Sequence, residues 1–171
     1  MSSINGAGIK IMECLYIMLE SGCVITRLVY IGKQCTIEFT MNNSSWTIRA
    51  GGKIAETAVN KLCDQLKAFN VISHDDWQYH TTRFYCHQAA PPNANATANA
   101  TANAAISTVR HTHNKNIAIM TFILNAILSG WRVKKSFSRS SEYRFNKPHG
   151  GKRKYLNADF LSRFLDHNIQ T

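Results

Sequence analysis

The strongest chemical signal in the sequence is a cluster of cationic side chains in its second half. Between Trp131 and Tyr155 there are nine lysines and arginines and one carboxylate, Glu142. Cations at this density neutralise phosphates and release their counterions, which is typical of proteins that bind the backbone of nucleic acid or another polyanion. We therefore predict a nucleic-acid-binding site made of these cations and one aromatic residue: Arg132, Lys134, Lys135, Phe137, Arg139, Arg144, Lys147, Lys152, Arg153 and Lys154.

The cluster overlaps a predicted β-hairpin in which apolar and basic side chains alternate. Strand geometry puts alternating side chains on opposite faces. The apolar face, which we expect to pack against helices, comprises Trp131, Val133, Tyr143 and Phe145. The basic face comprises Arg132, Lys134 and Arg144, and the basic loop from Lys147 to Lys154 flanks it. Phe137 lies in a serine-rich turn and is the best candidate for stacking on a base.

Histidines and cysteines suggest metal binding as a second chemistry, but their spacing does not favour it. The obvious set matches neither a zinc finger nor a zinc ribbon: His74, His80, Cys86, His87, His111 and His113. Segments 74–76 (His-Asp-Asp) and 149–151 (His-Gly-Gly) have no nucleophile elbow, phosphate loop or paired-carboxylate motif beside them. We expect loop residues there, and no metal, cofactor or enzymatic activity.

The charge of the chain is divided unequally. The 171 residues carry a net charge of +10. Residues 1–88 hold eight basic and seven acidic side chains (8 − 7 = +1), and residues 89–171 hold twelve and three (12 − 3 = +9). Apolar residues make up 44% and charged residues 18%, which is enough apolar material for a folded core. The alternative to polyanion binding is a basic surface that serves solubility alone.

The first 88 residues predict a small α+β unit. An apolar helix over residues 9–19 ends at Ser21-Gly22, and alternating segments over 27–31 and 35–41 form a hairpin. Residues 46–49 could add a short third strand. Gly51-Gly52 opens a second helix whose apolar stripe is Ala55, Ala58, Leu62, Leu66 and Phe69. The run from Trp77 to Gln88, rich in aromatic residues and threonine, predicts a further strand.

A linker and a second unit follow. Pro91-Pro92 begins a segment in which Asn-Ala-Thr-Ala recurs, so residues 89–114 are predicted to be a flexible, low-complexity linker. Residues 115–171 repeat the order of elements, with a helix over 117–128 ended by Ser129-Gly130 and then the basic hairpin. A final helix is predicted from its N-cap, its first-turn acid and its apolar face: Asn157, Asp159, Phe160, Leu161, Phe164 and Leu165.

The two halves align weakly but in the same order. Residues 11–12 match 119–120, Ser21-Gly22 matches Ser129-Gly130, and Glu38-Phe39 is aligned with Arg144-Phe145. We therefore predict an α+β fold made of a duplicated α-β-β-α unit, that is helix, β-hairpin, helix. The alternative is one α+β domain whose halves are alike because helices and hairpins are common.

Two resemblances accompany this interpretation. The order helix, strands, helix over residues 9–69, with Gly51-Gly52-Lys53 before the second helix, is similar in outline to the double-stranded-RNA-binding domain, which implies phosphate contacts from Lys53 at a helix N-terminus. The second half resembles small basic proteins of large DNA viruses, which implies a viral, virion-associated protein. That resemblance rests on Gly130, Trp131, Val133, Lys134, Lys135, Tyr143 and Phe145.

Compartment and partners complete the expectation. Five cysteines without a CxxC spacing predict reduced thiols, and the N-terminus has neither a signal peptide nor a membrane span, so we expect an intracellular protein of cytoplasm or nucleus. We predict a non-enzymatic protein whose basic second unit binds DNA or RNA and whose first unit contacts a protein partner or a second copy. The alternative is a virion or ribonucleoprotein component whose basic half binds an acidic protein.

Overall fold

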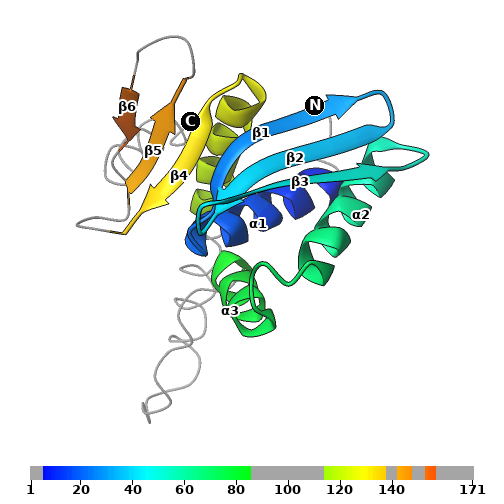
Figure 1. Ribbon diagram of the computed structural model, residues 1–171, viewed down its shortest axis with the longest axis horizontal. Helices are drawn as coiled ribbons and strands as arrows, with labels where there is room; N and C mark the ends of the chain where they lie inside the picture. Colours follow the sequence, from blue (N-terminus) through cyan, green and yellow to red (C-terminus); the bar gives the residue numbers. More distant parts are fainter. Residues whose placement is uncertain (1–5, 86–113, 138–141, 148–152, 157–171) are drawn as a thin grey trace, which may run out of the picture.

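A computed structural model of the chain describes residues 6–85, 114–137, 142–147 and 153–156, with the backbone alone for residues 6, 7, 55 and 153–156. Six antiparallel strands form one sheet in the order β3-β2-β1-β4-β5-β6, which confirms the α+β class (Figure 1). The elements are α1 (Gly6–Glu20), β1 (Val24–Ile31), β2 (Gln34–Met41), β3 (Ser44–Gly51), α2 (Ala55–Ala68), α3 (His74–Tyr85), a helix over residues 114–128, β4 (Arg132–Ser136), β5 (Glu142–Asn146) and β6 (Arg153–Leu156).

Helix α1 is apolar around almost its whole circumference. From Ile11 to Glu20 every residue except Glu13 is buried. The helix ends in a Schellman motif, in which Gly22 adopts φ 87° and the Cys23 amide donates to the Met18 carbonyl at 2.9 Å. The predicted helix and its glycine stop are confirmed.

The first three strands form a meander whose turns follow from short sequence signals. Gly32 takes φ 60° in the two-residue turn between β1 and β2. Asn42 and Asn43 take φ 50° and 63° between β2 and β3, as a type I′ turn requires, and this turn matches the right-handed twist of the strands. The short third strand expected over residues 46–49 is present and longer, since β3 runs from Ser44 to Gly51.

The region after β3 holds two helices, and the second corrects the sequence prediction. Helix α2 forms as expected, although Phe69, at the end of its predicted stripe, is exposed. The strand expected over residues 77–88 is wrong, because residues 74–85 form helix α3. A serine N-cap explains the start of the helix: the Asp76 amide donates to the Ser73 hydroxyl at 3.1 Å, and that hydroxyl donates to the Asp76 carboxylate at 2.7 Å.

The α-β-β-α unit predicted for each half is not confirmed. The first half runs helix, three strands, helix, helix, and the described part of the second runs helix, three strands. The shared α-β-β-β order begins at a constant spacing, because residues 6–20 correspond to 114–128 and Val24 of β1 to Arg132 of β4, 108 residues apart each time. The cross-strand register supports the predicted alignment of Phe39 with Phe145, because Phe39 lies opposite Ile25 and Phe145 lies opposite Val133. The helix expected after Asn157 and most of the linker lie outside the described residues.

The two halves meet through their first strands. Strand β1 pairs with β4 at Val24↔Lys134 and Ile25↔Val133. Ile25 and Val133 are 108 residues apart, and both are fully buried where the two strands pair. The segments 1–88 and 115–171, predicted as separate units, therefore contribute strands to one continuous sheet.

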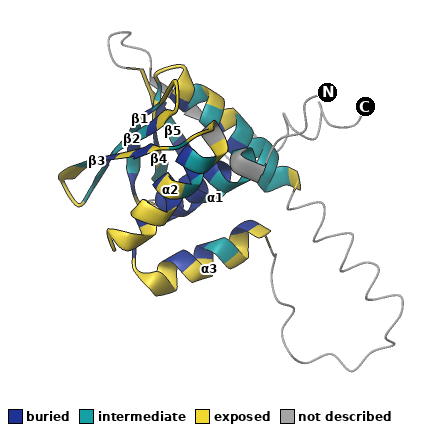
Figure 2. Cartoon of the chain, turned by 90° about the vertical axis from the view of Figure 1, so that its right-hand side faces the viewer, coloured by how far each residue is buried: buried dark blue, intermediate teal, exposed yellow. Residues whose placement is uncertain are grey.

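The helices complete a core that both halves share. Seen from the side, α1 and α2 lie on one side of the sheet (Figure 2). The helix over 114–128 buries Met120, Ile123 and Ile127 in the same cluster as α1, and the Thr121 hydroxyl contacts the Met12 sulfur at 3.3 Å. The opposite face of the sheet, which we call the open face, carries no helix among the described residues (Figures 1 and 2).

A shared core predicts cooperative unfolding. Leu15→Ala removes a fully buried side chain of α1 and should lower the free energy of unfolding by about 2–5 kcal/mol. In native-state hydrogen exchange, the protection free energy of amides in β2 and in β5 should fall by the same amount as the unfolding free energy. The control Ile54→Ala, at an exposed position, should change the unfolding and protection free energies by less than about 0.5 kcal/mol. Unchanged protection in β5 would show that the halves unfold separately.

Candidate nucleic-acid interface

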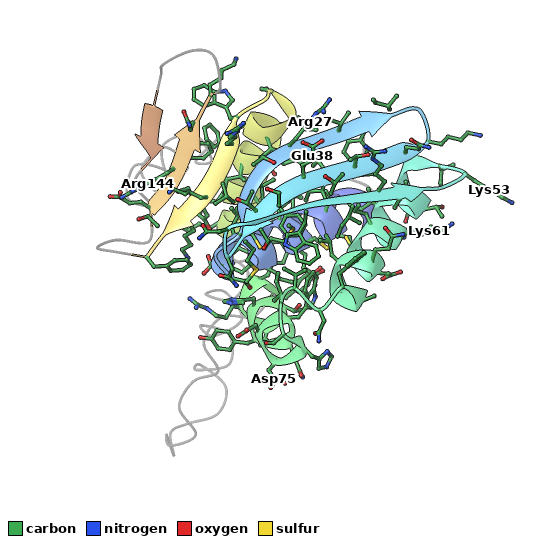
Figure 3. All side chains as sticks on the ribbon, in the orientation of Figure 1. Arg27, Glu38, Lys53, Lys61, Asp75 and Arg144 are labelled. Atoms are coloured by element: carbon green, nitrogen blue, oxygen red, sulfur yellow. The ribbon has the colours of Figure 1, made fainter. Side chains whose placement is uncertain are left out.

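The pairing of β4 with β5 puts three of the predicted cations on the open face. Lys134 lies directly opposite Arg144, and Arg132 lies opposite Asn146. The alternate residues Val133, Tyr143 and Phe145 are buried on the helix side, as predicted. Arg132 and Lys134 are exposed and Arg144 is half-buried; Figure 3 shows Arg144 on β5.

A hollow lies among these cations. It has a volume of about 380 Å³ and is lined by Arg132, Lys134 and Arg144, together with Val24 of β1 and Asn146 of β5. We call it the basic hollow. Its position at the β1–β4 junction means that the first half contributes one wall.

The register places two cationic side chains directly opposite each other. Lys134 and Arg144 are a directly opposed pair of like charges, and such cross-strand pairs destabilise a sheet by roughly 0.2–1 kcal/mol. A bound phosphate between two cations would remove this repulsion and add charge-assisted hydrogen bonds. The pair therefore concentrates positive charge at this point of the open face.

Lys147 extends the basic surface beyond β5. It is exposed, and its ammonium lies 5.7 Å from the centre of the Trp131 ring, in a cation–π geometry. Trp131 is half-buried and directly follows Gly130, which ends the helix over 114–128 with φ 84°. Lys147 thus lies at the end of the sheet where β4 begins.

Lys135 does not belong to the basic face, which corrects its assignment as a contact residue. It points to the helix side, its side chain is 9% exposed, and its ammonium forms an ion pair with the Glu20 carboxylate, which is 5% exposed. The Tyr143 hydroxyl also donates to Glu20, at 3.4 Å. A buried carboxylate requires such partners, because leaving it uncompensated costs several kcal/mol.

The surroundings of this ion pair are buried and include aromatic side chains. Burial, with a contribution from the Glu20 charge, raises the pKa of Tyr143 well above its ordinary value, so its hydroxyl stays protonated and can donate. Burial also lowers the pKa of His80 on α3, which keeps this imidazole neutral near pH 7. The cluster therefore joins α1, α3, β4 and β5 without adding charge to the surface.

Phe137 is likewise separated from the open-face cations. It follows β4 on the helix side, with 62% of its surface exposed. Its ring lies 4.0 Å from the position a Cβ would take on Gly22, and 5.8 Å from the Lys135 ammonium. The aromatic candidate and the basic hollow thus lie on different sides of the sheet.

The remaining predicted contact residues are placed only in part. Arg153 and Lys154 lie in β6, opposite Asn146 and Phe145 of β5, and only their backbone is described. Arg139 and Lys152 lie outside the described residues. Strand β6 nevertheless extends the sheet at its edge beside β5.

Other chemistries find little support in the described part of the chain. It contains no group of three or more potential metal ligands, and of the histidine–cysteine set only His74 and His80 are described, both in α3. Segment 74–76, expected to be a loop, is the first turn of that helix. No described helix combines the length and apolar character needed to cross a bilayer.

The described cysteines are buried free thiols: Cys14, Cys23, Cys35 and Cys63. Burial raises the pKa of Cys23 to about 12. A hydrogen bond with Cys63, together with burial, raises the pKa of Cys14 well above its ordinary value. Thiols of this kind pack as small apolar residues and are poor nucleophiles.

Comparison of the chain with protein-family models, with curated proteins and with solved structures gives no match. The functional argument therefore rests on the geometry of the open face.

The buried pair yields a test that separates two adjacent lysines. Glu20→Met or Lys135→Met alone should cost about 3–5 kcal/mol of unfolding free energy, because each leaves a buried charge uncompensated, and the double variant should recover most of that loss. The double variant should keep its affinity for nucleic acid, whereas Lys134→Met should weaken it. Denaturant unfolding and a binding titration measure the two effects, and equal loss of binding in both variants would contradict the assignment of faces.

Proposed function

We propose that this chain is a non-enzymatic nucleic-acid-binding protein that contacts the sugar-phosphate backbone through the open face of β4 and β5. The observation that supports this most strongly is the gathering of Arg132, Lys134 and Arg144 around one hollow. Side chains of this kind position a nucleic acid without reading its bases, so the proposed binding is largely independent of sequence.

A comparison of equivalent positions supports a division of labour between the halves. At the 108-residue spacing, Arg132 and Lys134 correspond to Val24 and Thr26, and by the cross-strand register Arg144, which precedes Phe145, corresponds to Glu38, which precedes Phe39. The repeated α-β-β-β order suggests a duplicated unit, and we propose that its second copy acquired the cations. In the first half, the cross-strand pair Arg27 and Glu38 carries charges of opposite sign. In the second half, the cross-strand pair Lys134 and Arg144 carries two positive charges.

The first test is the salt dependence of binding. With three to five phosphate contacts, log K should fall against log salt with a slope of roughly −3 to −5 on duplex DNA. The double variant Arg132→Ala/Lys134→Ala should flatten this slope by about two units. Fluorescence anisotropy with the full chain and homopolymer DNA or RNA over a salt series measures both.

A matched control is available on the helix side. Lys61→Ala/Lys67→Ala removes the same net charge from exposed positions within α2 and should leave the slope nearly unchanged; Figure 3 shows Lys61 on this helix. Equal effects of the two double variants would mean that net charge alone drives binding. Retention by polyglutamate and not by nucleic acid would instead favour an acidic protein partner.

Phe137 provides a test of base stacking. Because its ring lies on the side away from the cations, Phe137→Ala should change affinity for single strands by less than about twofold and leave the salt slope intact. A base stacked on this ring would instead make the substitution cost about 1–3 kcal/mol. Titrations with poly(dT) and a duplex of equal length distinguish these results.

A further inference from the structure

A second, larger hollow lies on the open face beside the basic hollow. Its volume is about 600 Å³, and its walls come from β1, β2, β3 and the ends of β4 and β5. The polar side chains that line it include Thr26, Arg27, Glu38, Thr47, Arg132 and Lys147. We call it the junction hollow. Arg132 belongs to both hollows, so the two are adjacent at this residue.

The hollow is located where the two halves stop pairing. The β1–β4 ladder contains only Val24↔Lys134 and Ile25↔Val133, and the register of β1 against β2 shifts between Ile25 and Arg27. Such a bulge bends and twists a strand locally. Thr26 fills the bulge, with its hydroxyl donating to the Glu38 carbonyl at 2.9 Å.

The bulge in β1 places Arg27, a cation of the first half, in the same hollow as Arg132 and Lys147. Its side chain is 60% exposed, and its guanidinium lies 3.4 Å from the carboxylate of Glu38, which is 35% exposed. Figure 3 shows the two residues on neighbouring strands β1 and β2. An exposed pair at this distance contributes little to stability, so Arg27 can exchange Glu38 for a phosphate at small cost.

The junction hollow has the side chains that contact a nucleic-acid backbone. Arg27, Arg132 and Lys147 outnumber the one carboxylate, Glu38, and threonine hydroxyls fill the space between them. Arginine, lysine, serine and threonine are the residues that hold phosphates and sugars. Charge complementarity therefore makes a polyanion chain the occupant of this hollow.

We infer that the nucleic acid bound at the basic hollow continues across the β1–β4 junction, so that the first half supplies Arg27 and neighbouring hydroxyls as backbone contacts. This inference rests on the proposed function and widens its footprint. The Glu38 carboxylate limits the affinity of this site for nucleic acid, because it competes with phosphate for the Arg27 guanidinium.

Two substitutions with opposite expected signs test the inference. Arg27→Ala should weaken binding of the full chain to homopolymer DNA or RNA by roughly 3- to 10-fold and flatten the salt slope by about one unit, since one phosphate contact is lost. Glu38→Gln keeps the shape of the side chain, removes the competing charge, and should strengthen binding by a similar factor. Anisotropy titrations over a salt series measure both.

Arg49→Ala is the matched control. Arg49 lies on β3 opposite Thr36, exposed on the same face and outside the junction hollow, so its loss should leave the slope unchanged. If Arg27→Ala and Glu38→Gln match this control while Arg132→Ala/Lys134→Ala weakens binding, the wider footprint is wrong and the proposed function stands. If the Arg132/Lys134 variant also has no effect, the proposed function itself is wrong. Should Arg27→Ala fail to fold, Glu38→Gln alone decides, because unchanged or weaker binding contradicts the inference.

Discussion

Helix α1 can present almost no surface to water, and the rest of the structure depends on covering it. From Ile11 to Leu19 only Glu13 is not buried, and even that carboxylate receives hydrogen bonds from Thr81 and Tyr85 of α3. A helix apolar on all sides must be enclosed rather than laid on a surface. The sheet, α2, α3 and the helix over 114–128 do this together, which is why the second half is part of the core.

This enclosure has an electrostatic consequence at the end of the helix. Glu20 is carried into the interior with the last turn of α1, where an unpaired carboxylate would be very costly. Lys135 from β4 compensates it, so one lysine of the basic cluster is used to join the halves. The cations left on the open face are those whose strand positions point away from α1.

Local signals in the sequence predicted a large part of this arrangement. The alternation in β4 and β5 assigned Arg132, Lys134 and Arg144 correctly to the face opposite Val133 and Phe145. This assignment needs only the sequence of the strand, because successive side chains point to opposite faces. The composition of α3 predicts a strand, because its aromatic and threonine residues favour strands; the local signal for the helix is Ser73, which caps its start through the Asp76 amide. The burial of Lys135 could not be predicted, since its partner Glu20 lies 115 residues away. The β1–β4 pairing, which brings Arg27 next to Arg132 and Lys147, is equally non-local.

The pairing of equivalent strands at Ile25 and Val133 makes the chain resemble a dimer whose two subunits have been joined. Each half, taken alone, would expose a first strand with unsatisfied backbone groups, and such an edge is a template for pairing with another chain. Joining the halves by residues 86–113 holds the two edges at high effective concentration, so pairing within the chain prevails in dilute solution. The same contacts would form if two chains exchanged their second halves, because β4 of either chain fits β1 of the other. Domain exchange is therefore a form of self-association that the pairing of β1 with β4 permits.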